Sequence, residues 1–466
     1  MNIKDDFILS QINDGYLVGG SVRDALLGKS FVDRDIAIKG AEEFAKKLAK
    51  KFNATFVVLD PEYKIYRLVL EDKINYLDIS EIQGGKNATI ENDLARRDFT
   101  MNAIAINLSS GEIIDPFAGK SDIENKIIKH IKDANFEEDP LRILRAFRFA
   151  STTGFELSEE VKTCINKYKH LLFNPAKERI NYELMKLFGG KCSKVLLEMD
   201  EFGILEELFP YVKEMKKVPP NTHHHLDLFH HVVETVRNIE ELYENAVLEE
   251  KEHLDTVDFG GFPRINHLKL AGFLHDIGKF STWTIEDSGR HRFIKHDDVG
   301  AKMCVPILRD LKFSKKQIDY ISTMIKYHIY PSNVIVAPDL SEKVMMRYVR
   351  KMETNVIDNI YLAKADRLSA RGEAITDEIV KENLDGLDKL LCFYLEKREN
   401  LKPLPKLLDG LEIMEIKGIK QSPELGKIIN ALKEAQINGD ITSKEEAIDF
   451  VKAFNIIKNQ EKGCVL

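Results

Sequence analysis

The sequence predicts an α/β head at the N-terminal end, followed by a remainder that is almost entirely helical. Short runs of β-branched and aromatic residues between residues 16 and 81 are typical of strands: YLVGG, DIAIK, TFVVLD, YRLVLE and NYLDIS. Among them, residues 41–52 (AEEFAKKLAKKF) place apolar side chains at helical spacing. From about residue 122 onward helical patterns dominate. Together these observations predict a small mixed sheet joined to several helical domains.

Breaks in the helical pattern divide the chain further. Its 466 residues suggest roughly three domains of about 150 residues each. VPPN at 218–221 and LKPLPKLLDG at 401–410 contain the prolines and glycines that end helices. We therefore expect a head, a helical neck and body, a His-rich helical domain and a helical tail, at residues 1–122, 123–217, 218–390 and 391–466.

Composition excludes several classes of protein. The hydrophobic fraction is 44%, enough for sizeable cores, and no apolar run reaches the ~18 residues of a membrane span. The net charge of −8 is not that of a general nucleic-acid binder, although charge can be local. The first residues lack the apolar region of a signal peptide. Five cysteines without CxxC spacing favour a reducing cytoplasm over a disulfide or zinc-ribbon framework: Cys164, Cys192, Cys304, Cys392 and Cys464.

The first candidate site lies in residues 17–38, LVGGSVRDALLGKSFVDRDIAI, where carboxylates open a predicted strand. Asp33 and Asp35 are two residues apart, so on a strand both side chains point to the same face. Paired carboxylates on a rigid face suit Mg²⁺, which takes oxygen ligands and is commonly shared with substrate phosphates. Asp78, on another predicted strand, is a candidate third carboxylate. We predict a magnesium site built on Asp33 and Asp35.

Two glycines precede these carboxylates. Gly19 and Gly20 lack a Cβ, so backbone N–H groups there can approach phosphate oxygens closely. Arg23 can neutralise the same oxygens through a two-pronged contact. The stretch is thus interpreted as a triphosphate cradle facing a metal pair. The alternative is purely structural: the glycines end a strand, Ser21 caps a helix, and the aspartates are solvated.

Five motifs, in order along the chain, carry a resemblance to a known family. They are GGSVRD with DRD in residues 19–35, LARRDFTMNAIA at 94–105, DPFAGKSDI at 115–123, EEDPLRILRAFRFAS at 137–151 and PAKERINYEL at 175–184. They resemble the class II nucleotidyltransferases, the family of tRNA CCA-adding enzymes and bacterial poly(A) polymerases. The resemblance implies a polymerase-β-like head that transfers CMP, with or without AMP, from CTP and ATP to the 3′ end of tRNA.

The resemblance also assigns residues. Two Mg²⁺ ions would be held by Asp33 and Asp35, with Asp78 as a further catalytic carboxylate. One ion activates the attacking hydroxyl and the other stabilises the leaving pyrophosphate. Nucleotide contacts are implied for residues of the first, second and fourth motifs: Gly19, Gly20, Arg23, Asp24, Arg96, Arg97, Asp98, Asn102, Asp139, Arg142, Arg145 and Arg148.

Asp139 and Arg142 admit two interpretations. Asp139-Pro140 has the form of a helix N-cap followed by proline at the first helical position, so Asp139 can be a structural cap. The resemblance implies instead that Asp139 and Arg142, one helical turn apart, meet the donor and acceptor edge of cytosine or adenine. Such a protein template would select the nucleotide without any nucleic-acid template.

The second half of the chain carries a different set of motifs. LDLFHHVVETV, LHDIGK and KADRLSARG resemble an HD phosphohydrolase domain. His231 is preferred to its neighbour His230 as a ligand, because it lies four residues after Asp227 as in the family pattern. His296 and His328 are candidates for a second metal. Histidine with carboxylate suits Mn²⁺, Ni²⁺, Zn²⁺ or Fe, and the expected substrates are 2′,3′-cyclic phosphates or 2′-phosphates. The resemblance implies four ligands for the first metal: His231, His275, Asp276 and Asp366.

Other functions remain open on the sequence alone. A bacterial poly(A) polymerase shares all the head motifs. The intact Asp33/Asp35 pair and RRD motif argue against an HD phosphohydrolase with an RNA-binding head, and a structural tRNA-binding role needs none of the metal ligands. The interval 81–94, EIQGGKNATIENDL, is short and lacks a basic, Gly-Tyr-containing loop. Members of the family that add the full CCA usually carry a long flexible loop there, so the resemblance implies addition of CC only; alternatively, Gly84 and Gly85 give a short loop enough freedom for addition of the full CCA. The sequence predicts no oligomeric state.

Overall fold

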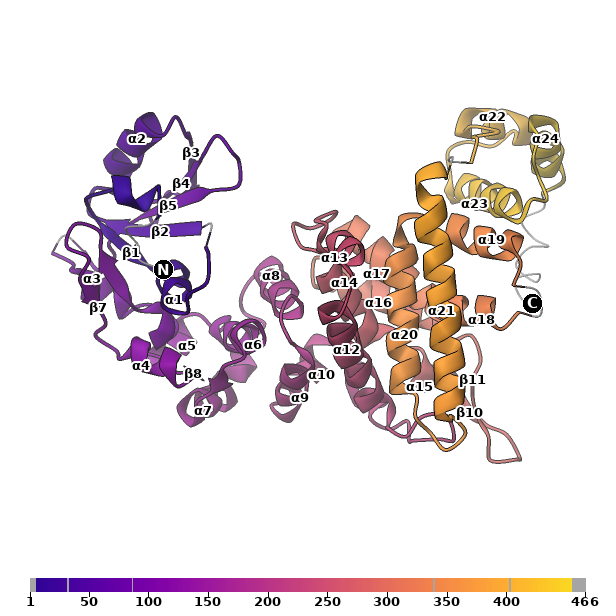
Figure 1. Cartoon of the computed structure of the whole chain (residues 1–466), viewed down its shortest axis with the longest axis horizontal. Coiled ribbons are helices and arrows are strands. Elements are labelled where there is room, and N and C mark those ends of the chain that lie inside the picture. The colour runs from indigo at the N-terminus through magenta and orange to yellow at the C-terminus, as the bar shows by residue number, and fades with distance from the viewer. Residues whose placement is uncertain (1–5, 32, 86, 338–339, 402–403, 455–466) are drawn as a thin grey trace.

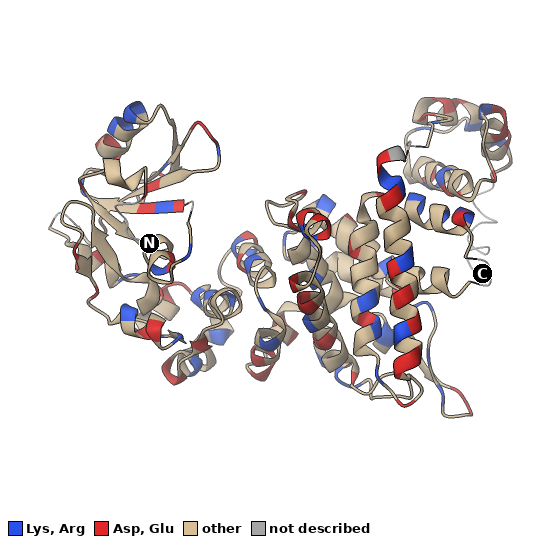
Figure 2. Ribbon diagram, in the orientation of Figure 1, with Lys and Arg blue, Asp and Glu red and all other residues tan. Residues whose placement is uncertain are grey.

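The computed structural model describes residues 6–454, apart from residues 32, 86, 338–339 and 402–403. Head, neck, helical bundle and tail follow one another along the long axis of the molecule (Figure 1). Cys464 lies outside the described residues. Acidic and basic residues are interspersed over the head and the helical part alike (Figure 2), so any strong local charge depends on particular side chains.

The head is a seven-stranded sheet in the order β3-β4-β5-β2-β1-β6-β7, in which only β2 and β5 pair in parallel. The five predicted strands are confirmed as β1 to β5, and the predicted helix at 41–52 is confirmed as α2. The elements are β1 (Tyr16–Val18), α1 (Gly20–Leu26), β2 (Asp33–Ile38), α2 (Ala41–Lys51), β3 (Thr55–Asp60), β4 (Ile65–Val69), β5 (Tyr76–Glu81), α3 (Ile90–Leu94), β6 (Ala105–Asn107), β7 (Ile113–Ile114) and α4 (Gly119–Glu124).

Strand β2 places the candidate carboxylates. Its last three residues, Ile36 to Ile38, are buried in the core of the head, which fixes the strand in the middle of the sheet. Its first three residues, Asp33 to Asp35, lie at the open end of the strand, and Arg34 between them is buried on the opposite face. There Arg34 forms a buried ion pair with Asp6, at 2.7 Å between Nη2 and Oδ2. The alternation therefore leaves the two aspartates on the same face.

The neck begins with short elements and continues as helices. Helix α6 packs against α8, and α8 packs against α14 of the bundle, so α8 connects the two parts (Figure 1). The neck elements are β8 (Ile127–Ile128), α5 (Ala134–Glu138), α6 (Arg142–Thr153), β9 (Glu156–Leu157), α7 (Glu159–Tyr168), α8 (Lys177–Phe188), α9 (Ser193–Glu201), α10 (Ile204–Leu208) and α11 (Val212–Met215).

The bundle holds the His-rich segments around a core formed by α12, α14 and α20. Its elements are α12 (Leu228–Glu244), α13 (Leu248–Asp255), α14 (Arg264–Leu274), α15 (Lys279–Thr282), β10 (Trp283–Ile285), β11 (His291–Phe293), α16 (His296–Asp310), α17 (Lys315–Tyr327), α18 (Tyr330–Ile335), α19 (Glu342–Met352), α20 (Val356–Ser369) and α21 (Asp377–Lys397).

The tail has a small hydrophobic core of its own, formed by α22 (Gly410–Lys417), α23 (Pro423–Asn438) and α24 (Lys444–Ala453). Lys351 and Lys433 form ion pairs between this tail and the bundle. The predicted sequence of an α/β head followed by helical parts is thus confirmed. Within the described ranges, no helix is both long and apolar enough to span a bilayer.

Candidate functional sites

The turn between β1 and α1 brings a backbone segment against two charged side chains. Gly19 has φ +74° and ψ −139°, a conformation that L side chains rarely adopt. A Cβ at this position would lie 2.9 Å from Arg97 Nη1 and 3.1 Å from Asp35 Oδ2. Ser21 Oγ donates to the Asp33 carbonyl at 2.9 Å and accepts from the Asp35 N–H at 3.2 Å. Glycine is therefore required here for close approach, and α1 is tied directly to β2.

The two predicted metal carboxylates differ in environment. Asp33 is exposed, whereas Asp35 is partly covered and lies deeper along the same face of β2. Burial raises the pKa of Asp35 to about 6; Arg97 opposes this rise, while Asp78 and Asp33 add to it. A divalent cation would relieve this concentration of negative charge, so these side chains fit a metal that takes oxygen ligands.

The predicted third carboxylate occupies a different setting. Asp78 stands opposite Asp35 in the parallel pairing of β2 with β5. Arg67 Nε and Nη2 donate to its two oxygens, each at 2.7 Å. Asp78 is not among the described residues that line the cavity beside Asp33 and Asp35. The structure therefore places Asp78 near the candidate metal pair but commits both of its oxygens to Arg67.

The RRD motif contributes an anchored carboxylate. Asp98 is buried and accepts from Arg145 Nη2 at 2.6 Å, from Asn102 Nδ2 at 3.0 Å and from the Phe99 N–H. Although burial opposes ionisation, Arg145 and these hydrogen bonds hold the pKa of Asp98 well below its usual range. Asn102 Oδ1 in turn accepts from Arg23 Nη1 at 2.9 Å. The motif thus links the glycine turn to helix α6.

These elements enclose a cavity of about 710 Å³ between the head and the helices α6 and α8. Of the predicted head and neck residues, Asp78 and Arg96 alone are missing from its described lining, and Arg96 is exposed. The predicted residues that line it are Gly19, Gly20, Arg23, Asp24, Asp33, Asp35, Arg97, Asp98, Asn102, Asp139, Arg142, Arg145 and Arg148.

The candidate base-reading pair lies at the neck side of this cavity. The Asp139 carbonyl accepts from the Arg142 N–H at 3.0 Å, as the carbonyl of a residue just before a helix does, and helix α6 follows from Arg142. The Asp139 carboxylate is only 3.4 Å from the Leu141 N–H, whereas its other oxygen accepts from Arg179 Nη2 at 2.8 Å. Arg142 donates to the carbonyl of Arg96 at 2.7 Å. The capping contact is therefore weak, and both side chains face charged or polar partners around the cavity.

A buried carboxylate that the sequence did not reveal supports the arginines of α6. Glu183, 3% exposed, lies 3.1 Å from Arg145 Nη1 and 2.7 Å from Arg148 Nε. The Arg148 guanidinium also lies 3.7 Å from the centre of the Phe149 ring, and burial lowers the pKa of Arg148 to about 10. Arg145 shows the opposite shift, because the charges of Asp98 and Glu183 outweigh its burial and raise its pKa.

The sequence analysis also missed Arg179 and Lys186, which line the cavity from helix α8. With Glu183 they occupy positions i, i+4 and i+7, so one face of α8 is turned towards α6 and the cavity. The motif PAKERINYEL contains two of these residues, and its helical spacing is the signal that would have identified them.

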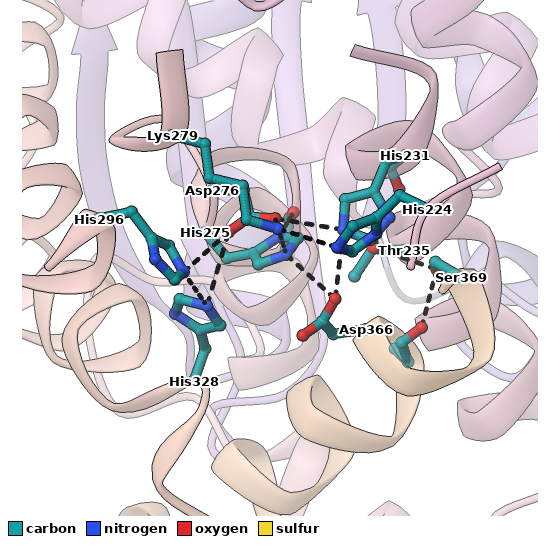
Figure 3. A network of polar contacts seen from close by, with 12 residues as sticks. His224, His231, Thr235, His275, Asp276, Lys279, His296, His328, Asp366 and Ser369 are labelled. Atoms are coloured by element: carbon teal, nitrogen blue, oxygen red, sulfur yellow. Dashed lines mark hydrogen bonds and ion pairs between the residues drawn. The ribbon is translucent and has the colours of Figure 1, made fainter. Parts of the chain in front are cut away.

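The predicted HD ligands also meet, in the middle of the bundle (Figure 3). His231 comes from α12, His275 and Asp276 follow directly after α14, and Asp366 comes from α20. His231 Nε2 lies 3.2 Å from Asp276 Oδ2 and 3.2 Å from Asp366 Oδ1, and His275 Nε2 lies 3.2 Å from Asp276 Oδ2. The neighbouring His230 is exposed and contacts Asp227 instead, at 2.6 Å.

A second group of histidines shares Asp276 with the first (Figure 3). His296 Nε2 and His328 Nε2 lie 3.3 Å and 3.6 Å from Asp276 Oδ1. The Nδ1 atoms of His275, His296 and His328 lie 2.7, 2.8 and 2.6 Å from backbone carbonyls. Each Nδ1 must therefore donate, which leaves each Nε2 lone pair directed into the cluster when the ring is neutral.

The polar atoms of this cluster also fit metal ligands. The Nε2 atoms of His231 and His275 and both oxygens of Asp276 are buried, and in the described residues none has a hydrogen bond of good geometry, although Lys279 Nζ forms an ion pair with Asp276 Oδ2 at 2.6 Å. Buried polar atoms without hydrogen bonds are rare unless an ion or water satisfies them. Gly278, two residues after Asp276, packs so closely that a Cβ would lie 2.1 Å from the His296 carbonyl oxygen. The arrangement offers one carboxylate to two adjacent metal positions.

Comparison with known proteins identifies the family. Residues 15–129 match the poly A polymerase head domain, residues 154–216 match the probable RNA and SrmB-binding site of polymerase A, and residues 228–371 match the HD domain. The multifunctional CCA protein of Actinobacillus pleuropneumoniae is 31% identical over 333 residues, which cover 68% of this chain and 75% of that protein. The chain belongs to the tRNA nucleotidyltransferase family.

Other members of the tRNA nucleotidyltransferase family match over nearly the full chain. A CC-adding tRNA nucleotidyltransferase of Thermus thermophilus is 28% identical and covers 96% of this chain and 95% of its own. An A-adding tRNA nucleotidyltransferase of Deinococcus radiodurans is 29% identical, with 94% of each chain covered. The fold resembles that of the Thermotoga maritima CCA-adding enzyme complexed with tRNA, with TM-score 0.52, 23% identity and coverage of 96% and 92%. The nucleotidyltransferase family uses divalent metals, and this chain has side-chain groups that could hold such an ion, among them His231, His275, Asp276 and Asp366.

Proposed function

We propose that this nucleotidyltransferase adds CMP to the 3′ ends of tRNA and stops after CC. The observation that carries nucleotide addition is the cavity in which Asp33 and Asp35 face arginines from both the head and the neck. The relatives from Thermus and Synechocystis, which match over nearly the full chain, are CC-adding enzymes, whereas the Deinococcus relative of similar identity adds A, so the choice of CC rests on the short connection described below. The head (1–122) would supply the chemistry, the neck and body (123–217) base selection and tRNA contacts, and the HD domain (218–390) and tail (391–466) further functions.

The transfer step forms one bond and breaks one. The 3′-oxygen of the tRNA attacks the α-phosphorus of CTP, the bond from that phosphorus to the bridging oxygen breaks, and pyrophosphate leaves, while the hydroxyl proton passes to water. Asp33 and Asp35 would hold two Mg²⁺ ions, which supply charge neutralisation and a more acidic hydroxyl. Arg23 and Arg97 line the same cavity and would hold the triphosphate against the glycine turn.

Base choice falls to Asp139 and Arg142. Cytosine presents an amino donor beside a ring-nitrogen acceptor, and uracil presents the reverse pattern. A carboxylate acceptor next to a guanidinium donor therefore accepts cytosine and rejects uracil. Adenine shares the pattern of cytosine, so this pair alone does not separate CTP from ATP.

The short connection between β5 and α3 supports an enzyme that stops after adding CC. Between β5, which ends at Glu81, and α3, which begins at Ile90, the chain makes a short turn in which Gly84 and Gly85 have positive φ. The Gln83 N–H donates to Asp93 at 3.1 Å, which ties this turn to α3. Re-aiming the base-reading pair from cytosine to adenine requires a movable element, and this turn offers little length for one.

The test is product length at single-nucleotide resolution. A tRNA lacking CCA, incubated with CTP and ATP together, should gain two nucleotides, and a tRNA ending in CC should gain none with ATP. A full CCA product formed at the rate of CMP addition would contradict the CC assignment. Oligo(A) tracts on RNA without a tRNA fold would instead identify a poly(A) polymerase.

A second activity is supported by the cluster in the HD domain. His231, His275, Asp276 and Asp366 would bind a transition metal such as Mn²⁺, Ni²⁺ or Zn²⁺, and this site would hydrolyse 2′,3′-cyclic phosphates or 2′-phosphates at RNA ends. The buried ligand atoms without hydrogen bonds carry this proposal. We also propose that the protein works in the reducing cytoplasm, and the four free cysteines among the described residues are compatible with this location.

Two neighbouring histidines provide a matched pair of variants for the HD activity. His231→Ala should abolish hydrolysis of 2′,3′-cyclic AMP in the presence of Mn²⁺ or Ni²⁺, and it should leave CMP addition to tRNA unchanged. His230→Ala, on the exposed side of the same helix, should keep both activities. Wild-type protein that hydrolyses neither substrate class with any of these metals would make the domain structural.

A further inference from the structure

Helix α8 presents a charged face to the cavity that no part of the proposed mechanism has used. Arg179, Glu183 and Lys186 are spaced at i, i+4 and i+7, on the face turned towards α6. Glu183 contacts the arginines of α6, whereas Arg179 reaches the candidate base acceptor, Asp139. Helix α8 therefore contacts and supports the side chains that are expected to read the base.

The contact between Arg179 and Asp139 involves one carboxylate oxygen. Arg179 Nη2 lies 2.8 Å from Asp139 Oδ2, and Oδ1 has the long contact of 3.4 Å with the Leu141 N–H. An ionised carboxylate has about four acceptor positions, so the contact leaves capacity for another donor. Oδ1 thus remains suited to accept an amino group from a base in the cavity.

The Asp139 carboxylate needs a hydrogen-bond partner from another element to fix its orientation. It lies between α5 and α6, with φ −138° and ψ 90°, and therefore outside the regular backbone of either helix. Its side chain is 28% exposed, so packing alone does not restrict it. A guanidinium is planar and directional, and it fixes the plane of a carboxylate better than an ammonium does.

We propose that Arg179 is a positioning residue that sets the specificity of nucleotide addition by holding Asp139 in the orientation that accepts the cytosine amino group. The inference rests on the proposed function, because it concerns the base-reading pair of that reaction. Arg179 keeps Oδ2, the amino group of cytosine donates to Oδ1, and Arg142 donates to the adjacent ring nitrogen. Uracil, with a carbonyl facing Oδ1, is then repelled.

The Arg179–Asp139 ion pair is exposed to solvent, which distinguishes a role in base selection from a role in stability. Arg179 is 53% exposed, and exposed ion pairs contribute little to stability. Removing Arg179 should therefore leave the folded protein intact while freeing Asp139 to rotate. A direct contact of Arg179 with the triphosphate would give a different result, because all nucleotides share that group and would be affected equally.

The experiment measures kcat/KM for CTP and for UTP separately, on tRNA lacking CCA, with the full-length protein. Arg179→Ala should lower the preference for CTP over UTP by about tenfold or more, since a base contact of this kind discriminates by that order. Arg179→Lys should restore part of the preference. Lys177→Ala is the matched control, because Lys177 lies on the same helix but pairs with Asp310 outside the cavity, at 3.3 Å.

Two outcomes would overturn the inference. Equal losses for CTP and UTP in Arg179→Ala would make Arg179 a phosphate ligand, and an unchanged preference would remove it from base selection altogether. Both presuppose wild-type protein that incorporates CMP, so they are distinguishable from a failure of the proposed function, in which wild-type protein adds no CMP. Melting temperatures within a few degrees of wild type show that the variants are folded.

Discussion

Replacing Asp35 by asparagine should stabilise the metal-free protein while abolishing nucleotide addition. The carboxylate is partly covered, and burial raises its pKa from 3.8 to about 6. The folded protein thus binds a proton on the Asp35 carboxylate more tightly than the unfolded chain does. Protonation of Asp35 therefore stabilises the folded state: this stabilisation is complete below pH 3.8 and is lost as the pH rises through about 6. At neutral pH the folded state carries an unfavourable charge, which asparagine removes at nearly constant volume.

The size of the effect follows from the same pKa difference. The change from 3.8 to about 6 corresponds to about 3 kcal/mol as an upper limit, at about 1.4 kcal/mol for each pH unit. Asp35 borders an open cavity, and water there screens its charge, so we expect a gain of about 1–2 kcal/mol. For a domain of this size that gain is a rise of a few degrees in melting temperature.

The assay is calorimetry in EDTA at several pH values from 4 to 8, following the transition of the head. Wild-type stability should fall across pH 4–6 relative to Asp35→Asn, and the two proteins should converge at the acidic end. Mg²⁺ with CTP should raise the melting temperature of wild type and not that of the variant. Asp33→Asn, at the exposed neighbouring carboxylate, should lose activity without comparable stabilisation. A lower melting temperature for Asp35→Asn at pH 7 in EDTA would refute the reasoning.

Three further substitutions test close contacts. Gly19→Ala should abolish CMP addition, because a Cβ at that positive φ meets charged side chains within 3.1 Å; binding of CTP, measured by calorimetry, should fall with it. Glu183→Gln should lower the free energy of unfolding in urea by about 2–4 kcal/mol, because Arg148 then loses its buried counter-charge while Arg145 keeps only Asp98. Gly278→Ala should remove Mn²⁺ binding from the HD domain by displacing His296, with CMP addition retained.

Local sequence patterns were sufficient to predict most of the helices and strands. The alternation and β-branched composition of β3 to β5, and the apolar spacing of α2, identify these elements because neighbouring residues decide them. The parallel pairing of β2 with β5 was not predictable in the same way. It brings Asp35 opposite Asp78 across more than forty positions of chain, and no short-range pattern encodes that register.

The same distinction separates the site residues that were predicted from those that were not. Residues within a motif, such as those of the glycine turn, come together because the motif is one local structure. Arg67 holds Asp78, and Arg179 holds Asp139, only after strands and helices have packed. Arg96 shows the converse: it stands next to Arg97 in the motif, but its side chain is exposed outside the cavity and its carbonyl accepts from Arg142.

The division of the cavity between two parts of the chain bears on how its specificity can change. The candidate metal carboxylates belong to the sheet of the head, whereas the candidate base-reading pair, Asp139 and Arg142, belongs to the neck. Asp98 joins them, because it binds the RRD turn of the head and Arg145 of α6 at once. On its far side α8 is fixed to the bundle, where Asn181 donates to the Leu311 carbonyl at 3.0 Å. A small shift of the neck against the head would therefore move the candidate base-reading pair and leave the candidate metal carboxylates in place, so we expect that base preference can change without loss of nucleotide transfer.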